Sequence, residues 1–454
     1  MDASPTMTTV RDTSAAPAAA TPALFALALR PFQAFLRLEA ASGIVLLGCA
    51  VAALVWANVA FDSYRRLFAA PLTIGVGGLV ARFSVLELVN DGLMTLFFFI
   101  VGMEIKRELV HGELRTRAQA ALPAIAALGG MLVPAAIFLA LNAGGPGAPG
   151  WGVPMATDIA FCIGVLTLLK RRVPHGLIVF VTALAVFDDI GGIVVIAVFY
   201  GTGVRWSWLL AAAVIAAGAL AMSRAQVRSA AAWTIAGVML WYALHHSGVH
   251  PTIAGVILGL AVPARPRRRA RDVIRELATH ANALARAAEE EERDEAALHG
   301  VDDRLEELEA PLTRFVHALH PWIAFAVMPL FALANSGVHL AGLEAAQVTG
   351  TVAVGTLVAL FVGKQVGIFT FTLAAVRVGL ARIPGGASYP KLLGVSIVAG
   401  IGFTVALFIA GLAYPSAPRL LDEAKLGIIA GSLVSGSVGA LLLSLTAPVQ
   451  TAPG

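Results

Sequence analysis

The chain contains a succession of apolar runs that are each about as long as a bilayer is thick. A membrane-spanning helix needs about 20 apolar residues, and hydrophobic residues make up 58% of the 454 residues. Charged residues make up only 13%, against about 25% in soluble domains. The predicted fold is therefore an all-α polytopic membrane protein with about twelve transmembrane helices. These spans are predicted near 41–60, 86–105, 118–141, 152–169, 176–200, 206–222, 230–245, 250–262, 318–336, 352–376, 393–413 and 424–446.

The basic residues of the chain lie mainly in alternate loops between these runs. The loop at 170–172 is Lys-Arg-Arg, whereas the loop at 142–150 carries no charge. Because basic loops stay in the cytoplasm, both termini are predicted to be cytoplasmic. The net charge of +4 thus comes from basic residues in the loops between spans. It does not indicate a nucleic-acid-binding surface, and no nucleic-acid partner is expected.

The runs divide the chain into five predicted segments. A flexible tail without a cleavable signal peptide is expected first, and a charged cytoplasmic loop with solvated helices separates spans one to eight from spans nine to twelve. The segments are a tail at 1–35, helices at 36–264, the charged loop at 265–316, helices at 317–447 and a tail at 448–454.

A short β-hairpin is predicted outside the membrane between the first two spans, over residues 72–86. Two β-prone stretches, at 72–76 and 82–86, flank Gly77 and Gly78, a pattern typical of a tight turn. An ordinary loop is the alternative. An exposed hairpin edge could pair with its twin from a second subunit.

Two adjacent acidic residues, Asp188 and Asp189, lie in the middle of the apolar run at 177–200. One carboxylate at the centre of a membrane helix costs about 2.5–3.5 kcal/mol. The pair therefore indicates a cation or proton site at membrane depth. The structural alternative is a protonated pair that is hydrogen-bonded to neighbouring helices.

Two other spans carry features that interrupt a helix. Pro154 precedes Thr157 and Asp158 in the fourth span, and Gly400 and Gly402 lie in the eleventh. Proline and glycine weaken a helix, so both spans are predicted to be broken. Asp158 and Thr157 either cap a helix end or bind the ion. Because the breaks occupy matching places in the two halves, they indicate an inverted repeat with the binding site where the broken spans cross.

A single lysine, Lys364, lies deep in the tenth span. A buried lysine needs a carboxylate partner or loses its charge. Asp188 or Asp189 is the expected partner. The alternative is that the side chain reaches the membrane surface.

Several short strings occur in an order typical of one transporter family. They are VGMEIKREL at 101–109, ATDIAF at 156–161, AVFDDIG at 185–191, SGVH at 247–250, HPW at 320–322, GK at 363–364 and GIGFT at 400–404. With them the chain resembles the NhaA-type bacterial Na⁺/H⁺ antiporters over about residues 35 to 447.

This resemblance implies a function and a location. It implies exchange of cytoplasmic Na⁺ or Li⁺ for external H⁺ by alternating access, electrogenic and activated by pH, in the bacterial inner membrane. No cofactor is expected, because the ions themselves are the substrates. It also implies a homodimer that is joined through the hairpin at 72–86.

The resemblance further implies a role for individual residues. It implies that Asp189 binds Na⁺ with Asp188 beside it, and that Lys364 pairs with Asp188. It places Asp158 and Thr157 at the crossing. The pH-response residues that it implies are Glu104, Arg107, Glu108, His250 and His317. The chain departs from the family at Val316, where better-studied members have a glutamate, and this leaves the activating pH open.

Three other classes of membrane protein fit the sequence less well. An intramembrane aspartyl protease needs two aspartates from different helices, whereas Asp188 and Asp189 are adjacent. An ion channel would not explain Lys364 or two broken spans. A proton-coupled transporter of an organic substrate would need an aromatic-lined polar cluster, which the sequence does not indicate.

Overall fold

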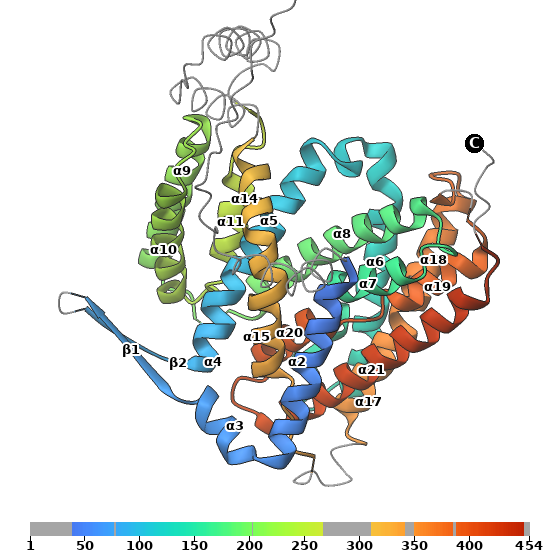
Figure 1. Cartoon of the computed structure of the whole chain (residues 1–454), viewed down its shortest axis with the longest axis horizontal. Helices are drawn as coiled ribbons and strands as arrows, with labels where there is room; N and C mark the ends of the chain where they lie inside the picture. The colour runs from blue at the N-terminus through green and yellow to red at the C-terminus, as the bar shows by residue number, and fades with distance from the viewer. Residues whose placement is uncertain are drawn as a thin grey trace, which may run out of the picture.

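The structure is a computed structural model of the whole chain (Figure 1). The predictions for both tails and for most of the charged loop lie outside the residues that it describes. The described residues are 39–76, 79–201, 203–266, 310–340, 349–384 and 387–448.

Helices dominate these residues, and three of them contain a π-helical turn. The elements of the first half are α2 Glu39–Val59, α3 Phe61–Phe68, β1 Pro71–Val76, β2 Leu79–Ser84, α4 Val85–Glu87, the π turn η1 Leu88–Leu93, α5 Met94–Val110, η2 Glu113–Arg115, α6 Arg117–Asn142, the 3-10 helix η3 Ala148–Met155, α7 Ile159–Leu168, α8 His175–Phe199, α9 Trp206–Arg224, α10 Ala230–Ser247 and α11 Ile253–Ala261. Those of the second half are α14 Pro311–Trp322, the π turn η4 Ile323–Val327, α15 Met328–Asn335, α17 Thr351–Val358, the π turn η6 Ala359–Gly363, α18 Lys364–Arg377, α19 Tyr389–Val398, α20 Phe403–Ala413 and α21 Pro418–Leu445.

The all-helical membrane fold is confirmed. Among the described residues, 9 helical stretches are long and apolar enough to cross a membrane, and a bent pair makes a tenth span. The bent pair is α19 and α20, which meet at an angle of 46°. A helix that contacts lipid is apolar on most of its surface, as these stretches are.

Two of the predicted spans, 230–245 and 250–262, correspond to α10 and α11. α11 has 9 residues and is therefore about 14 Å long, much less than the roughly 30 Å hydrocarbon core. Because α11 is packed against α5 and α10, it lies within the bundle. The count of twelve spans stays a prediction.

The predicted hairpin is present and is slightly displaced from 72–86. β1 and β2 pair in antiparallel fashion from Pro71 opposite Ser84 to Val76 opposite Leu79. The helix that follows begins directly after Ser84, whose hydroxyl accepts from the backbone of Glu87 in a capping box. The hairpin projects away from the helices in Figure 1.

Glycine lets several helix pairs approach backbone to backbone. A methyl group on Gly367 of α18 would meet the backbone carbonyl of Gly129 on α6. In the same way, a methyl group on Gly255 of α11 would meet the backbone of α5 at Thr95 and Phe99. Small residues allow such packing in membranes, where no hydrophobic effect drives helices together.

The helices form two groups that meet along a few contacts. α6, α8, α17, α18, α19, α20 and α21 pack together, as do α2, α5, α9, α10, α11, α14 and α15. α7 lies between the groups and contacts α2 of the second group and α8 and α21 of the first. The groups also touch where α5 meets α8 and where α15 meets α20. Figure 1 shows α9 and α10 at one flank and α18, α19 and α21 at the other. The acidic pair on α8 lies next to this boundary.

Candidate ion-binding site

The fourth predicted span is broken between η3 and α7. η3 contains Pro154 and ends at Met155, and the chain is extended from Ala156 until α7 begins at Ile159. Asp158 is the N-cap of α7 and accepts a hydrogen bond of 3.2 Å from the backbone N–H of Phe161. The break predicted at the proline is therefore present.

The second broken span crosses the first at this point. The backbone N–H of Asp158 donates to the carbonyl of Ile401, at 2.6 Å, in the unwound segment between α19 and α20. The other carboxylate oxygen of Asp158 accepts from the backbone N–H of Thr404 at 3.1 Å and from the Thr404 hydroxyl. One carboxylate thus caps the first turns of both α7 and α20, whose free N–H groups carry partial positive charge.

A buried ion pair lies beside the crossing. Lys364 Nζ donates to Asp188 Oδ2 at 2.6 Å, and the Lys364 side chain has no exposed surface. Thr157 Oγ1 lies 2.7 Å from the same Asp188 oxygen and 3.0 Å from the carbonyl of Ala399. Because a hydroxyl has one hydrogen, Thr157 donates to only one of them at a time. The pair therefore joins α8, α18 and the first break.

Two carboxylate groups keep free acceptor atoms here. Asp188 Oδ1 is buried and has no hydrogen-bond partner in the described structure. Asp189 is 8% exposed, and no described residue forms a hydrogen bond or an ion pair with its side chain. Buried polar atoms are normally paired, so these oxygens are exceptions that remain available to a further ligand.

Within the described part of the chain, no three histidine, cysteine, aspartate or glutamate side chains are arranged to hold a metal ion. The acceptors that have no partner among the described residues, Asp188 Oδ1 and the Asp189 carboxylate, are oxygen atoms. Hard cations accept such oxygen ligands.

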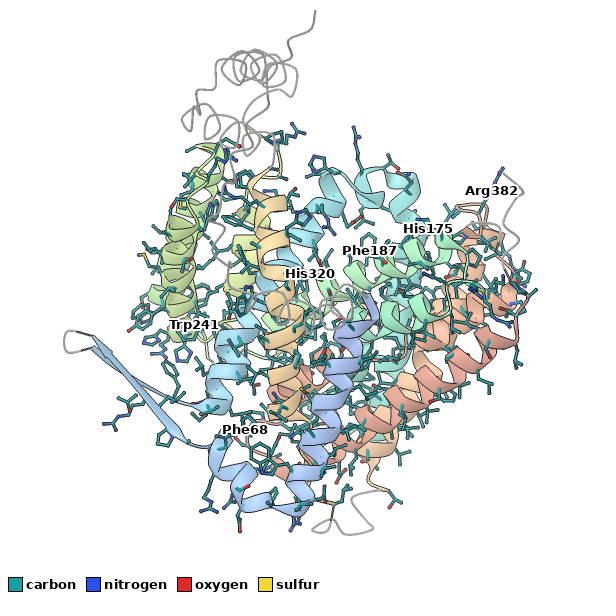
Figure 2. The ribbon with its side chains drawn as sticks, in the orientation of Figure 1. Phe68, His175, Phe187, Trp241, His320 and Arg382 are labelled. Atoms are coloured by element: carbon teal, nitrogen blue, oxygen red, sulfur yellow. The ribbon has the colours of Figure 1, made fainter. Side chains whose placement is uncertain are left out.

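The residues implied in the pH response fall in two places. Glu104, Arg107 and Glu108 lie on the last turns of α5, and His317 lies on α14, which packs against α5. Figure 2 shows His320 of α14 in the same part of the bundle. An open surface pocket lies at the end of α5 and is lined by Glu108, His111, Gly112, Arg115, Thr116 and Gln119.

His250 lies apart from that group, in the loop between α10 and α11. Its Nε2 atom is 3.7 Å from Asp91 Oδ1 on the π turn η1. The backbone carbonyl of Asp91 also accepts from the indole N–H of Trp241 at 3.1 Å, and Trp241 contacts Phe83 of the hairpin, with ring centroids 6.1 Å apart. Figure 2 places Trp241 on the side of α10 that faces α4. The structure therefore does not bring His250 together with the other four.

Sequence reasoning missed two site contacts. Thr404 was part of a motif but had no assigned role, although its hydroxyl reaches Asp158. The signal was a hydroxyl two positions after Gly402 in the second break, as Thr157 comes three positions after Pro154 in the first. The contact between Asp91 and His250 had no signal in the sequence, because 159 positions separate the two residues and neither spacing nor periodicity relates them.

The family model for Na⁺/H⁺ antiporter 1 matches residues 33–443. The chain belongs to this antiporter family. A Na⁺/H⁺ antiporter NhaA of Anaeromyxobacter sp. strain Fw109-5 is 66% identical, with 94% of each chain covered. NhaA 1 of Myxococcus xanthus is 56% identical over 94% of this chain and 95% of its own length.

A solved structure of a more distant antiporter shares the fold. The sodium proton antiporter of Methanocaldococcus jannaschii is 13% identical and superposes with a TM-score of 0.50 over 93% of this chain and 99% of its own. The antiporter family therefore accounts for the multi-span helical architecture. Its members are transporters and not enzymes.

Proposed function

We propose that the chain exchanges cytoplasmic Na⁺ or Li⁺ for external H⁺ at Asp189. The observation that supports this proposal is that only one of the two adjacent carboxylates has hydrogen-bond partners in the described part of the chain. Asp188 is tied to Lys364 and faces Thr157, whereas the side chain of Asp189 meets no partner among the described residues. A carboxylate that is unpaired and slightly exposed at membrane depth is available to an ion from solution.

Competition for one carboxylate couples the two ion flows. A protonated Asp189 cannot bind Na⁺, and a Na⁺-bound Asp189 cannot accept a proton. Binding of a proton to Asp189 therefore releases Na⁺, and binding of Na⁺ releases the proton. In each case the ion leaves on the side of the membrane to which the site is open. Alternation between two such states, each open to one side, gives antiport.

Asp188 and Lys364 supply a second group that responds to the bound ion. Na⁺ beside Asp189 would also attract the free Oδ1 atom of Asp188, and this competes with the bond to Lys364. Transport of more than one proton per cation would make the exchange electrogenic. We infer that this pair is the origin of such a second proton.

Asp158 has a different role in this proposal. Its two oxygens already accept from Phe161 and from Thr404. These bonds favour capping of the half-helices over direct ion binding, and Thr157 links the cap to Asp188. Asp158 is thus a positioning residue.

The remaining features complete the proposal at the level of the cell. Both termini and the basic loops face the cytoplasm of a bacterial inner membrane. Two chains form a homodimer through β1 and β2, which in the described part of the chain form a sheet of two strands with no third strand at either edge. Glu104, Arg107, Glu108 and His317 adjust activity to cytoplasmic pH, and His250 responds at the opposite end of the bundle.

The test measures collapse of a pH gradient in energised everted membrane vesicles after addition of Na⁺, Li⁺ or K⁺, at several pH values. Wild type is expected to respond to Na⁺ or Li⁺, and Asp189→Asn is expected to abolish the response. Asp62→Asn, at an exposed aspartate of α3, is the matched control and should behave as wild type. Retained exchange in a folded Asp189→Asn protein would contradict the assignment.

A further inference from the structure

Six basic residues occur at one end of the helices that surround the ion site, on the side that the loop charges place in the cytoplasm. They come from the loop between α7 and α8, from the end of α18 with the loop that follows, and from the start of α19. Figure 2 shows Arg382, and His175 at the start of α8, on this flank of the bundle. No acidic residue occurs at 159–187, 365–421 or 424–454. The six residues, here called the basic cluster, are Lys170, Arg171, Arg172, Arg377, Arg382 and Lys391.

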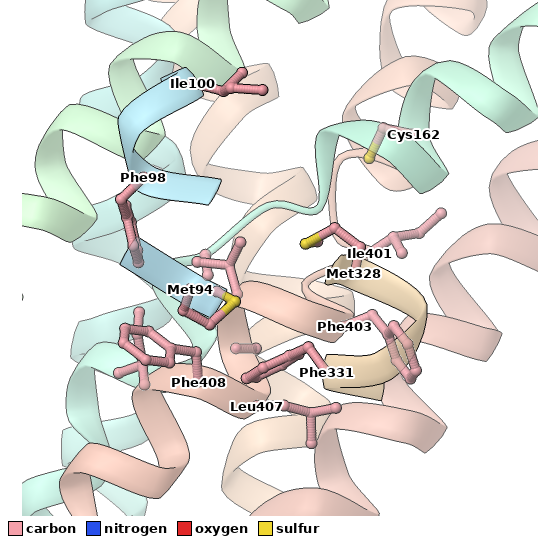
Figure 3. Close-up of a cluster of buried hydrophobic side chains, with 14 of the residues drawn as sticks. Met94, Phe98, Ile100, Cys162, Met328, Phe331, Ile401, Phe403, Leu407 and Phe408 are labelled. Atoms are coloured by element: carbon pink, nitrogen blue, oxygen red, sulfur yellow. The ribbon is translucent and has the colours of Figure 1, made fainter. Parts of the chain in front are cut away.

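A contact between α7 and α19 brings two parts of the basic cluster to the same depth. Cys162 Sγ donates to the carbonyl of Val398 at 3.2 Å, and Figure 3 shows Cys162 directed from α7 towards the segment that contains Ile401. Lys170 comes eight positions after Cys162, and Lys391 comes seven before Val398. Because α7 ends and α19 begins on the same side, each lysine lies about 10–12 Å beyond this contact.

The end of α21 connects the loop after α7 to the start of α19. Arg172 Nη1 donates to the Thr446 carbonyl at 2.5 Å. Three positions earlier, Leu443 packs against α19, where a methyl group on Gly394 would meet its side chain. Gly394 is about one helical turn from Lys391. Arg172 and Lys391 therefore lie on two sides of one helix end.

Lys391 is the member of the basic cluster whose position is hardest to explain without a ligand. Its side chain is only 9% exposed, and no described residue forms a hydrogen bond or an ion pair with its ammonium group. It lies in the first turn of α19, where the helix dipole is positive and a cation is unfavourable. No side chain caps the N–H groups of this turn, and helical side chains lean towards the N-terminus. The lysine and these N–H groups together offer a site for an anion.

The other cations make the same end strongly positive. Arg172 and Arg377 lie beside the last carbonyls of α21 and α18, where a cation is favourable. Lys170, Arg171 and Arg382 are exposed, and no described carboxylate pairs with them. Like charges held close together repel each other, so an anion among them would stabilise the arrangement.

Apolar side chains border the basic cluster and distinguish a lipid from a soluble anion. Tyr389, next to Lys391 in the first turn of α19, is exposed, and tyrosine is frequent where a helix leaves the membrane. Acyl chains cover exposed apolar groups, whereas a soluble ion would contact the cations alone. A lipid with an anionic head group therefore fits both parts of this surface. The other exposed apolar residues at this end are Leu168, Val378, Leu380 and Leu445.

We propose that the basic cluster binds the phosphate group of an anionic lipid of the inner leaflet. Lys391 and the first N–H groups of α19 hold the phosphate, and Lys170 and Arg172 lie beside it. The bound lipid neutralises Lys391 and holds the ends of α7, α19 and α21 together. This inference concerns the lipid-facing surface and does not rest on ion exchange at Asp189.

The first test counts bound lipid. The purified full chain is mixed with phosphatidylglycerol or phosphatidylcholine in neutral detergent, and native mass spectrometry measures the lipid retained. Wild type is expected to retain at least threefold more phosphatidylglycerol, and Lys391→Gln combined with Lys170→Gln to lose at least half of this excess. Arg224→Gln, at an exposed arginine of α9 on the same side of the membrane, is the matched control and should keep it. Equal retention by wild type and the double variant would overturn the site.

The second test separates a lipid from a soluble anion and does not depend on the glutamine variants. Phosphatidylglycerol is expected to raise the unfolding temperature of wild type by about 3 °C or more over phosphatidylcholine, and inorganic phosphate at the same concentration should not. Lys391→Arg keeps the charge and should keep the shift. Equal unfolding temperatures in the two lipids would overturn the site, and protection by inorganic phosphate as large as that by phosphatidylglycerol would overturn the lipid as its ligand.

Discussion

Lys364 and Asp188 form an ion pair of 2.6 Å in which neither side chain is more than 1% exposed. The two residues are 176 positions apart and lie on α18 and α8. Such a pair gains little over an apolar pair of the same volume, but loss of one partner leaves an uncompensated buried charge. The free energy of unfolding of the helix bundle therefore depends on whether this ion pair is intact.

Removal of the lysine alone should be costly. Lys364→Ala is expected to destabilise the protein by about 3–5 kcal/mol, because Asp188 is left buried without its partner. Thermal unfolding of the purified protein measures the effect. The double variant Lys364→Met with Asp188→Asn should recover much of the loss, and a melting temperature unchanged by Lys364→Ala would argue against the pair.

Loss of the Thr404 hydroxyl should weaken the crossing. Thr404→Val keeps the shape but removes a donor to Asp158, at an expected cost of about 1–3 kcal/mol. Thr404→Ser keeps the donor and is the matched control. Unfolding temperature and exchange rate should fall together in the valine variant; equal behaviour of the two variants would show that the hydroxyl is dispensable.

Contact between α6 and α18 should not tolerate a methyl group. Gly367→Ala forces a Cβ against the Gly129 carbonyl, and overpacking of this kind costs about 1–3 kcal/mol. A methyl group on Gly218 of α9 meets open space, so Gly218→Ala should be neutral or stabilising. Comparison of the two unfolding temperatures tests the prediction, which fails if both variants match wild type.

Tyr200 makes part of the folding stability depend on pH in the alkaline range. It lies just beyond α8, where its hydroxyl donates to the Pro149 carbonyl at 2.7 Å, and burial raises its pKa to about 12. The unfolded chain releases this proton near pH 10, so the contribution of Tyr200 is present below about pH 10 and is lost as the pH rises towards 12.

The variant Tyr200→Phe separates these effects. It should be less stable than wild type near neutral pH, because the Pro149 carbonyl loses its donor, but its stability should fall less steeply between about pH 10 and 12. Tyr389→Phe, at an exposed tyrosine of α19, serves as control. The same alkaline slope in Tyr200→Phe and wild type would refute the prediction.

The spans, the hairpin and the two breaks were predictable because each has a local cause. Apolar length marks a span, Gly77 and Gly78 mark a turn, and Pro154 interrupts a helix. The pairing of Lys364 with a carboxylate was predictable as well, since a charge at membrane depth needs a partner.

Contacts that depend on the crossing of distant elements were not predictable in this way. Thr404 reaches Asp158 only because two broken spans meet, and Tyr414 bonds the Gly147 carbonyl at 2.7 Å across 267 positions. No periodicity in a single segment encodes such pairs. Whether the short α11 crosses the membrane was not predictable either, because a buried helix within the bundle is as apolar as one in lipid.

The two broken spans contribute different groups to the cap at the crossing. The first broken span supplies the carboxylate, Asp158, and the second supplies only amide and hydroxyl donors, at Thr404. Two copies of the first half would bring two carboxylates face to face, and two copies of the second would bring none. If the halves arose by duplication, they have since become obligate complements, and neither could be exchanged for the other without dismantling the crossing.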